Sequence, residues 1–155
     1  MIDILKGIAA GAIATAVLSA LMLAHSSSGL LPALDPLELL MSAFGIGDQR
    51  PLGWIVHFVI GALLWGALFA WVEPRLPGDA HARRGTLFGV LVWLVMMLVI
   101  MPLAGAGVFA LRIGVPASLV TLLLHVVYGF VLGWTYGKLA PTRDPFASRN
   151  HRSTA

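Results

Sequence analysis

The sequence predicts an all-α integral membrane protein built as a bundle of four transmembrane helices. Hydrophobic residues make up 59% of the chain and charged residues 11%, where a soluble domain has about 25% charged residues. Charge-free runs cover residues 7–34, 51–72, 85–111 and 113–137. Each run exceeds the roughly 20 apolar residues that a spanning helix needs. Because the runs lack the alternation of barrel strands, we expect helices in all four.

The first expected span covers residues 5–25 and begins like a secretory signal, since Lys6 precedes a long apolar run. Residues 21–25 (Leu-Met-Leu-Ala-His) contain no small-x-small cleavage site. We therefore expect a retained helix and not a cleaved leader.

The segment that follows, residues 26–50, is expected to form the first outer loop and to contain a short helix. Asp35, Pro36 and Glu38 supply a capping residue, a proline at the first helical position and an acid in the first turn. An apolar stretch follows and Gly45 closes it. We expect this helix to lie along the membrane interface or over the mouth of the bundle.

The remaining spans are expected at residues 52–73, 85–104 and 116–138. Together with the first span they form one membrane domain over residues 1–140, and residues 141–155 form a basic tail. His81 and His151 fall in the loop and the tail on the side of the termini, where we expect solvated side chains.

The basic residues predict the orientation. Only Arg50 and Arg112 fall on one side of the expected membrane, and eight fall on the other: Lys6, Arg75, Arg83, Arg84, Lys138, Arg143, Arg149 and Arg152. The positive-inside rule then predicts cytoplasmic N- and C-termini in a bacterial-type inner membrane. The basic residues form no stripe, so we expect no nucleic-acid partner. The chain has no cysteine, which excludes disulfides and thiolate chemistry.

A short motif opens both the first and the third span. Lys6-Gly7-x-x-x-Gly11 resembles Arg84-Gly85-x-x-x-Gly89, and each is followed by an apolar helix, an outer loop and a helix that contains a histidine. The pattern predicts two copies of a helical hairpin, related as parallel repeats about an axis along the membrane normal.

The two intramembrane histidines are the strongest functional lead. His57 lies in Gly53-x-x-x-His57-x-x-x-Gly61, and His125 lies in Thr121-x-x-x-His125-x-x-x-Gly129. They precede Pro74 and Pro141 by 17 and 16 residues, so we expect them at nearly equal depth. Each imidazole therefore has a small residue one helical turn before it and one after it.

Two interpretations of this pattern stay open. Small residues one turn apart let membrane helices approach closely, and a histidine can hydrogen-bond a neighbouring helix. Alternatively, His57 and His125 are the axial ligands of haem b or bind another tetrapyrrole such as a chlorophyll-type pigment. In that case the site would include the small residues that leave room for the macrocycle: Gly53, Gly61, Thr121 and Gly129.

The overall prediction is a non-enzymatic membrane protein that serves as an accessory or structural subunit of a larger membrane complex. Its expected partners are the lipid bilayer and either other membrane subunits or further copies of itself. The chain has no phosphate-binding loop, His-Glu-x-x-His motif or nucleophile elbow. Haem b electron transfer and a small carrier that uses His57 and His125 are the alternatives. In size and hydropathy the chain resembles small four-span inner-membrane proteins of bacteria without an assigned function.

Overall fold

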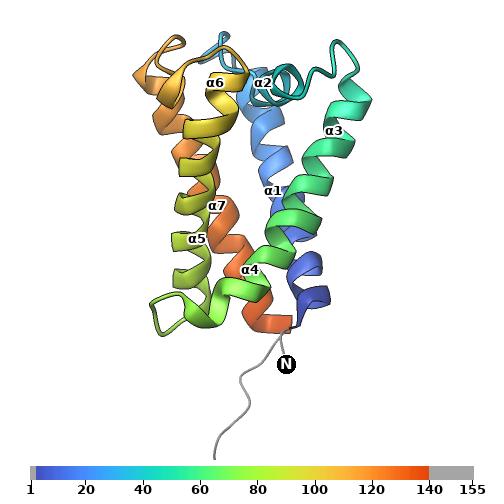
Figure 1. Cartoon of the computed structure of the whole chain (residues 1–155), viewed down its shortest axis with the longest axis vertical. Helices are drawn as coiled ribbons and strands as arrows, with labels where there is room; N and C mark the ends of the chain where they lie inside the picture. The colour runs from blue at the N-terminus through green and yellow to red at the C-terminus, as the bar shows by residue number, and fades with distance from the viewer. Residues whose placement is uncertain (1–2, 140–155) are drawn as a thin grey trace, which may run out of the picture.

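The computed structural model describes residues 3–139, and this part of the chain contains helices and loops but no strand (Figure 1). Four helical columns run side by side: α1 (Ile4–Ser28), the second span (Arg50–Arg75), the third span (His81–Leu103) and α7 (Val115–Leu139). All four are long and apolar enough to cross a bilayer, so the chain is a multi-pass membrane protein. The predicted tail, residues 141–155, lies outside the described residues.

The second and third spans each contain a π-helical segment. The second span consists of α3 (Arg50–Phe58), the π segment η1 (Val59–Trp65), α4 (Gly66–Val72) and the short turn η2 (Glu73–Arg75). The third consists of α5 (His81–Val95), the π segment η3 (Met96–Ile100) and α6 (Met101–Leu103). Pro102 lacks the amide hydrogen that would bond the carbonyl of Leu98, which accounts for the irregular turn at η3.

The prediction of four helices able to span a membrane is confirmed, and the observed helices begin and end a few residues from the expected bounds. The clearest case is α1, which continues through Ser28 instead of ending near residue 25. The Ser27 and Ser28 hydroxyls donate to the carbonyls of Ala24 and His25, and Gly29 then ends the helix in the left-handed conformation. These local bonds extend the helix past its apolar run.

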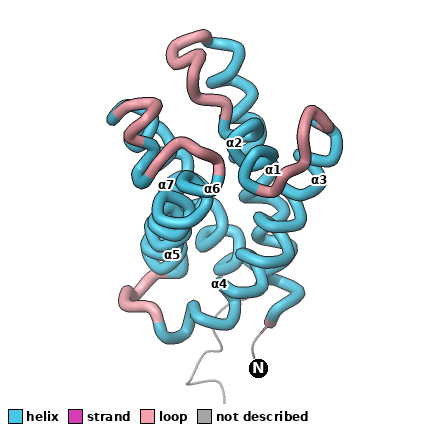
Figure 2. The backbone as a smooth tube through the Cα atoms, turned by 45° about the horizontal axis from the view of Figure 1, so that its top comes forward, coloured by secondary structure: helices cyan, strands magenta, loops and turns pink. Residues whose placement is uncertain are grey.

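The predicted short helix in the first loop is also confirmed, as α2 (Pro36–Ala43), which lies across one end of the bundle (Figure 2). Asp35 Oδ1 accepts hydrogen bonds from the amides of Leu37 and Glu38 at 3.0 and 3.1 Å. The other carboxylate oxygen accepts from the Arg50 guanidinium. Asp35 therefore starts α2 and ties it to the beginning of α3. We call the end of the bundle that carries α2 the loop end, and the opposite end, where α1 begins and α7 ends, the terminal end.

Glycines hold the helices together in two close pairs. A Cβ added to Gly11 of α1 would lie 2.9 Å from the Cα of Gly66, and one added to Gly89 of α5 would lie 3.0 Å from the Cα of Gly129. Backbone thus packs directly on backbone between α1 and the second span, and between α5 and α7. Such contacts are what small residues provide in a membrane, where no hydrophobic force drives helices together.

The two glycine contacts differ in register, which bears on the predicted repeat. In the first hairpin His57 lies nine positions before the contact glycine, Gly66, and in the second His125 lies four positions before Gly129. Measured from these matching contacts, the two histidines do not occupy equivalent positions. Duplication of the hairpin stays a prediction, and the histidines are not copies within it.

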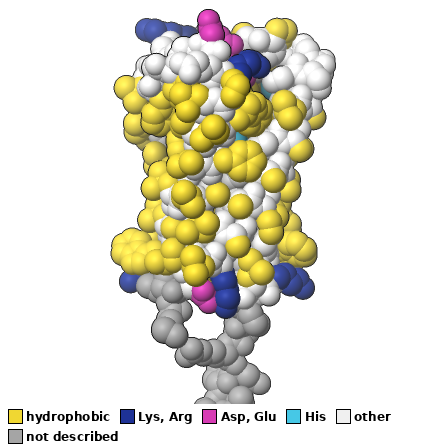
Figure 3. Space-filling view, turned by 90° about the vertical axis from the view of Figure 1, so that its right-hand side faces the viewer, with side chains coloured by type: hydrophobic (Ala, Val, Ile, Leu, Met, Phe, Trp, Pro, Cys, Tyr) yellow, Lys and Arg dark blue, Asp and Glu magenta, His cyan; other side chains and the backbone are white. Residues whose placement is uncertain are grey.

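The terminal end contains a buried charge cluster that joins the second and third spans. Glu73, with only 4% of its surface exposed, accepts hydrogen bonds from His81 Nδ1 at 2.7 Å and from the Arg84 guanidinium at 2.8 Å. The expectation that His81 is solvated is wrong, because its ring is half-buried against Glu73 and Tyr136. Other charges gather at the two ends and leave an apolar belt between them (Figure 3).

Replacing Gly89 by alanine should destabilise the protein. The new methyl group would meet backbone atoms of α7, and overpacking of this kind costs about 1–3 kcal/mol, more than the roughly 1 kcal/mol that alanine gains over glycine in helix propensity. Unfolding in mixed micelles, followed by circular dichroism, measures the difference. Leu91→Ala, at a lipid-exposed position of the same helix, is the control for a change of side-chain volume. A Gly89→Ala protein as stable as the wild type would contradict close backbone packing.

Replacing Glu73 by glutamine should cost about 1.5–3 kcal/mol, the contribution of a hydrogen bond to a charged group. The amide keeps the shape of the carboxylate but leaves Arg84 without its buried anion. Asp79→Asn is the matched control, since Asp79 pairs with Arg83 at the surface, where ion pairs contribute little. The same unfolding assay should separate the two variants, and equal stabilities would show that the cluster is not structural.

Candidate pocket between the four spans

A cavity of about 180 Å³ lies between the four spans, toward the loop end. Its walls are almost entirely apolar, and each span contributes, as does α2. The polar side chains on its surface are few: His57 from the second span, and Thr121, His125 and Tyr128 from α7. The pocket is thus a hydrophobic chamber with two imidazoles in it.

The pocket exists because the second and third spans meet at one end only. At the terminal end they are joined by aromatic contacts, with ring centroids 6.1 Å apart for Trp65 and Phe88 and 5.3 Å apart for Phe69 and Phe88. Toward the loop end the two spans diverge (Figure 1). The Tyr128 hydroxyl donates to the carbonyl of Gly61 at 2.7 Å and ties α7 to the second span beside Trp65. This hydrogen bond and the aromatic cluster close the floor of the pocket.

The amphipathic helix α2 covers the pocket at the loop end. Leu40 and Phe44 line the chamber, and Leu37 and Met41 are buried against the second span, where Met41 lies over Gly53. The ion pair between Asp35 and Arg50 holds this cover in place. The interfacial helix that the sequence predicts is therefore the roof of the chamber.

One side of the pocket faces the bilayer. Leu64 of the second span and Val95 of the third both line the chamber, yet 55% and 43% of their surfaces are exposed. Both lie on the apolar belt of the molecule, where the outer surface contacts lipid. The wall of the chamber between the second and third spans is therefore formed in part by side chains of the outer apolar surface.

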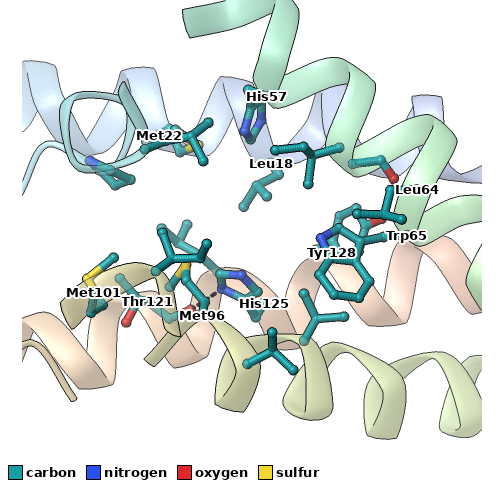
Figure 4. A pocket seen from close by; sticks show the side chains of 18 of the residues that line it. Leu18, Met22, His57, Leu64, Trp65, Met96, Met101, Thr121, His125 and Tyr128 are labelled. Atoms are coloured by element: carbon teal, nitrogen blue, oxygen red, sulfur yellow. Dashed lines mark hydrogen bonds between the residues drawn. The ribbon is translucent and has the colours of Figure 1, made fainter. Parts of the chain in front are cut away.

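The two histidines lie on opposite walls of the pocket and point toward each other (Figure 4). His125 Nδ1 donates to the carbonyl of Thr121 at 2.8 Å, which fixes the ring against α7. His57 is held edge-on between Trp54 and Phe58, at centroid distances of 5.7 and 6.0 Å. Its Nε2 is buried and has no hydrogen-bond partner among the described residues.

Four of the six residues that the sequence singled out meet at the pocket: His57, Gly61, Thr121 and His125. The other two do not. Gly53 is covered by Met41, and Gly129 packs against Gly89 on the far side of α7.

The small residues around the histidines serve packing in this structure. An added Cβ at Gly61 would strike Thr15 of α1, and the Thr121 hydroxyl accepts a hydrogen bond from Trp93 Nε1 at 3.3 Å. Their small size is explained by neighbouring helices, and not by clearance above an imidazole.

The sequence analysis missed Tyr128 and Trp65, which form the inner end of the pocket. Tyr128 follows His125 by three positions, so the two side chains share a helix face, and a hydroxyl in an apolar span needs a partner. That signal was available. For Trp65 it was not, because Trp65 is the last residue of the π segment η1, where side-chain directions depart from those of a regular α-helix.

The pocket offers imidazole nitrogens but no carboxylate. Within residues 3–139 no three side chains of the metal-binding types come together. What the site supplies to a ligand is an apolar chamber, aromatic faces at the inner end and one imidazole from each of two opposite walls.

No curated protein and no solved structure matches the chain. A family model matches residues 1–146, which covers all four spans, α2 and the pocket. The chain belongs to the family described as a family of unknown function, DUF6789.

Proposed function

We propose that this protein binds a small, mainly apolar molecule that reaches the pocket from the bilayer. The observation that carries the proposal is the position of His57 and His125 on opposite walls of an apolar chamber with an opening toward lipid. Apolar pockets with a few convergent polar groups are the usual form of small-molecule sites, and they occur between the helices of bundles.

The buried nitrogen of His57 supports a ligand. A buried polar atom without a hydrogen bond costs about 1–3 kcal/mol, and an isolated imidazole in a packing role would be expected to find a partner on a neighbouring helix. His57 Nε2 finds none among the described residues. Because this atom has almost no accessible surface, the ring must shift toward the chamber for a polar atom of a bound molecule to satisfy it.

The volume of the pocket limits the ligand to about one ring. A cavity of about 150 Å³ binds benzene in an engineered protein, and the chamber here measures about 180 Å³. Two facing imidazoles are suitable donors for haem iron. The tetrapyrrole macrocycle, with four pyrrole rings, is several times larger than one benzene ring, so the enclosed volume favours the smaller ligand.

We also infer that the terminal end faces the cytoplasm. Of the described basic residues, Arg50 and Arg112 lie at the loop end and the others at the terminal end: Lys6, Arg75, Arg83, Arg84 and Lys138. The positive-inside rule places the larger group in the cytoplasm. The pocket then lies in the half of the membrane away from the cytoplasm, below α2.

Membership of a larger complex stays a prediction, as do the absence of enzymatic activity and a role as a carrier. Large apolar side chains are exposed along α7, among them Leu119, Leu123 and Trp134. Lipid covers such a surface in any multi-pass protein, so these residues favour no particular protein partner.

Binding of p-xylene, a single apolar ring, tests the proposed function. We expect p-xylene to raise the unfolding temperature of the wild-type protein in detergent. The shift should be smaller in Leu64→Trp, which narrows the opening of the pocket. Leu63→Trp is the matched control, because Leu63 is exposed to a similar extent but does not line the pocket. Equal shifts in all three proteins would mean that p-xylene acts through the micelle, and the proposal would fail.

The absorption spectrum of the protein purified after expression with haem precursors decides between a one-ring ligand and haem. We expect no Soret band, because the enclosed volume suits one ring better than a macrocycle. A Soret band that disappears in both His57→Ala and His125→Ala and persists in His25→Ala would replace our proposal with bis-histidine haem b. His25 is a suitable control because it lies in α1 and does not line the pocket.

A further inference from the structure

We propose that the molecule in the pocket is the ring of a membrane-soluble para-quinol, with one hydroxyl on His125 and the other on His57. This inference rests on the proposed function and specifies its ligand. It follows from the hydrogen-bonding state of each imidazole, from their placement on opposite walls, and from the side on which the pocket opens.

The hydrogen bond of His125 determines what it offers to a ligand. A backbone carbonyl only accepts, so the nitrogen 2.8 Å from the Thr121 carbonyl, Nδ1, carries the hydrogen. A neutral imidazole has one such hydrogen, and its other nitrogen then presents a lone pair. No carboxylate lines the pocket to balance a charged ring. His125 Nε2 therefore accepts a hydrogen bond, and the ligand group that suits it is a hydroxyl.

His57 supplies the second polar contact from the opposite wall. Its ring lines the pocket, and no hydrogen bond from another described residue fixes which of its nitrogens carries the hydrogen. The ring can therefore accept from a hydroxyl or donate to its oxygen. A ligand held by both histidines needs polar atoms at two opposite edges.

The space between the histidines suits an aromatic ring. Leu18 and Leu124 line this space with aliphatic side chains, and Met96 adds a thioether, which packs favourably on aromatic rings. Trp65 and Tyr128 close the inner end. A single ring fills a chamber of about 180 Å³. Para substitution puts its two hydroxyls on opposite edges, as the histidines require.

The opening toward lipid accounts for the rest of the molecule. Leu64 and Val95 border the chamber and are exposed on the apolar belt, so an alkyl or isoprenoid tail attached to the ring would pass between them into the bilayer. A sterol or a long-chain alcohol has a single hydroxyl and would leave one of the two histidines unpaired. A quinol with a tail satisfies both.

Three probes of equal ring size and para geometry test the assignment: p-xylene, p-cresol and hydroquinone, which carry no, one and two hydroxyls. Binding is measured by titration calorimetry in detergent, with each dissociation constant corrected for the partition of the probe into micelles. Because a hydrogen bond contributes about 1–1.5 kcal/mol, each hydroxyl should tighten binding to the wild-type protein by about 5- to 10-fold.

Two variants assign the hydroxyls. His125→Phe should weaken p-cresol and hydroquinone by about 5- to 10-fold and leave p-xylene unchanged. His57→Phe should weaken hydroquinone by a similar factor and leave p-xylene unchanged. His25→Phe, outside the pocket, should change none of the three. Unchanged p-xylene binding in each variant also shows that the pocket still folds.

The outcomes separate this inference from the proposed function. If p-xylene binds and the hydroxyls add nothing, or if both histidine variants weaken all three probes equally, the quinol assignment is wrong and a generic apolar ligand stands. If p-xylene does not bind the wild-type protein but hydroquinone does in a histidine-dependent way, the quinol assignment stands and the apolar chamber contributes little. If none of the probes binds, the proposed function itself fails.

Discussion

The structure depends on the direct contact of helix backbones at glycine. Gly11 against Gly66 and Gly89 against Gly129 bring two pairs of helices together where even a methyl group would not fit. Nearly all of these contacts lie in the half of the bundle nearest the terminal end. Toward the loop end the facing residues are leucine and methionine, such as Leu18 and Met96, which hold the helices apart. The pocket is therefore the space that begins where the glycine contacts stop.

The π-helical segments adapt the second and third spans to this change of spacing. A π turn takes up an extra residue, widens the helix and changes the direction of the side chains that follow. In the second span it lies between His57 and Gly66, so the same helix can present glycine to α1 and its imidazole to the chamber. It also contains Gly61, whose carbonyl accepts the Tyr128 hydroxyl. A regular helix of the same sequence would turn one of these groups away.

Hydropathy, charge and local capping suffice to predict the four spans, α2 and the grouping of basic residues at one end, because these properties depend on residues close together in the chain. The rotation of each helix about its own axis does not depend only on residues close together in the chain, so it cannot be predicted in this way. His57 and His125 both line the pocket, but Gly53 and Gly129, which the tetrapyrrole interpretation would include in the site, pack on α2 and α5. Close packing of helices and room for a ligand beside an imidazole both require small residues. Only the groups that contact those residues in the structure distinguish the two explanations. The π segment of the second span is likewise not marked by any periodicity in the sequence, whereas that of the third span lies beside Pro102.

An unpaired buried nitrogen does not mark a site by itself. His25 Nε2 and Thr135 Oγ1 are also buried without partners among the described residues, and neither residue lines the pocket. His57 differs because its ring lines a cavity and a second imidazole lies on the opposite wall. His125 Nδ1 donates its hydrogen to the Thr121 carbonyl, so the other nitrogen of the neutral ring, Nε2, can only accept a hydrogen bond. A water molecule could satisfy one such group, but in an apolar chamber it would lack the two to four polar partners that a buried water needs. A molecule with an apolar ring between two polar ends meets all of these conditions at once.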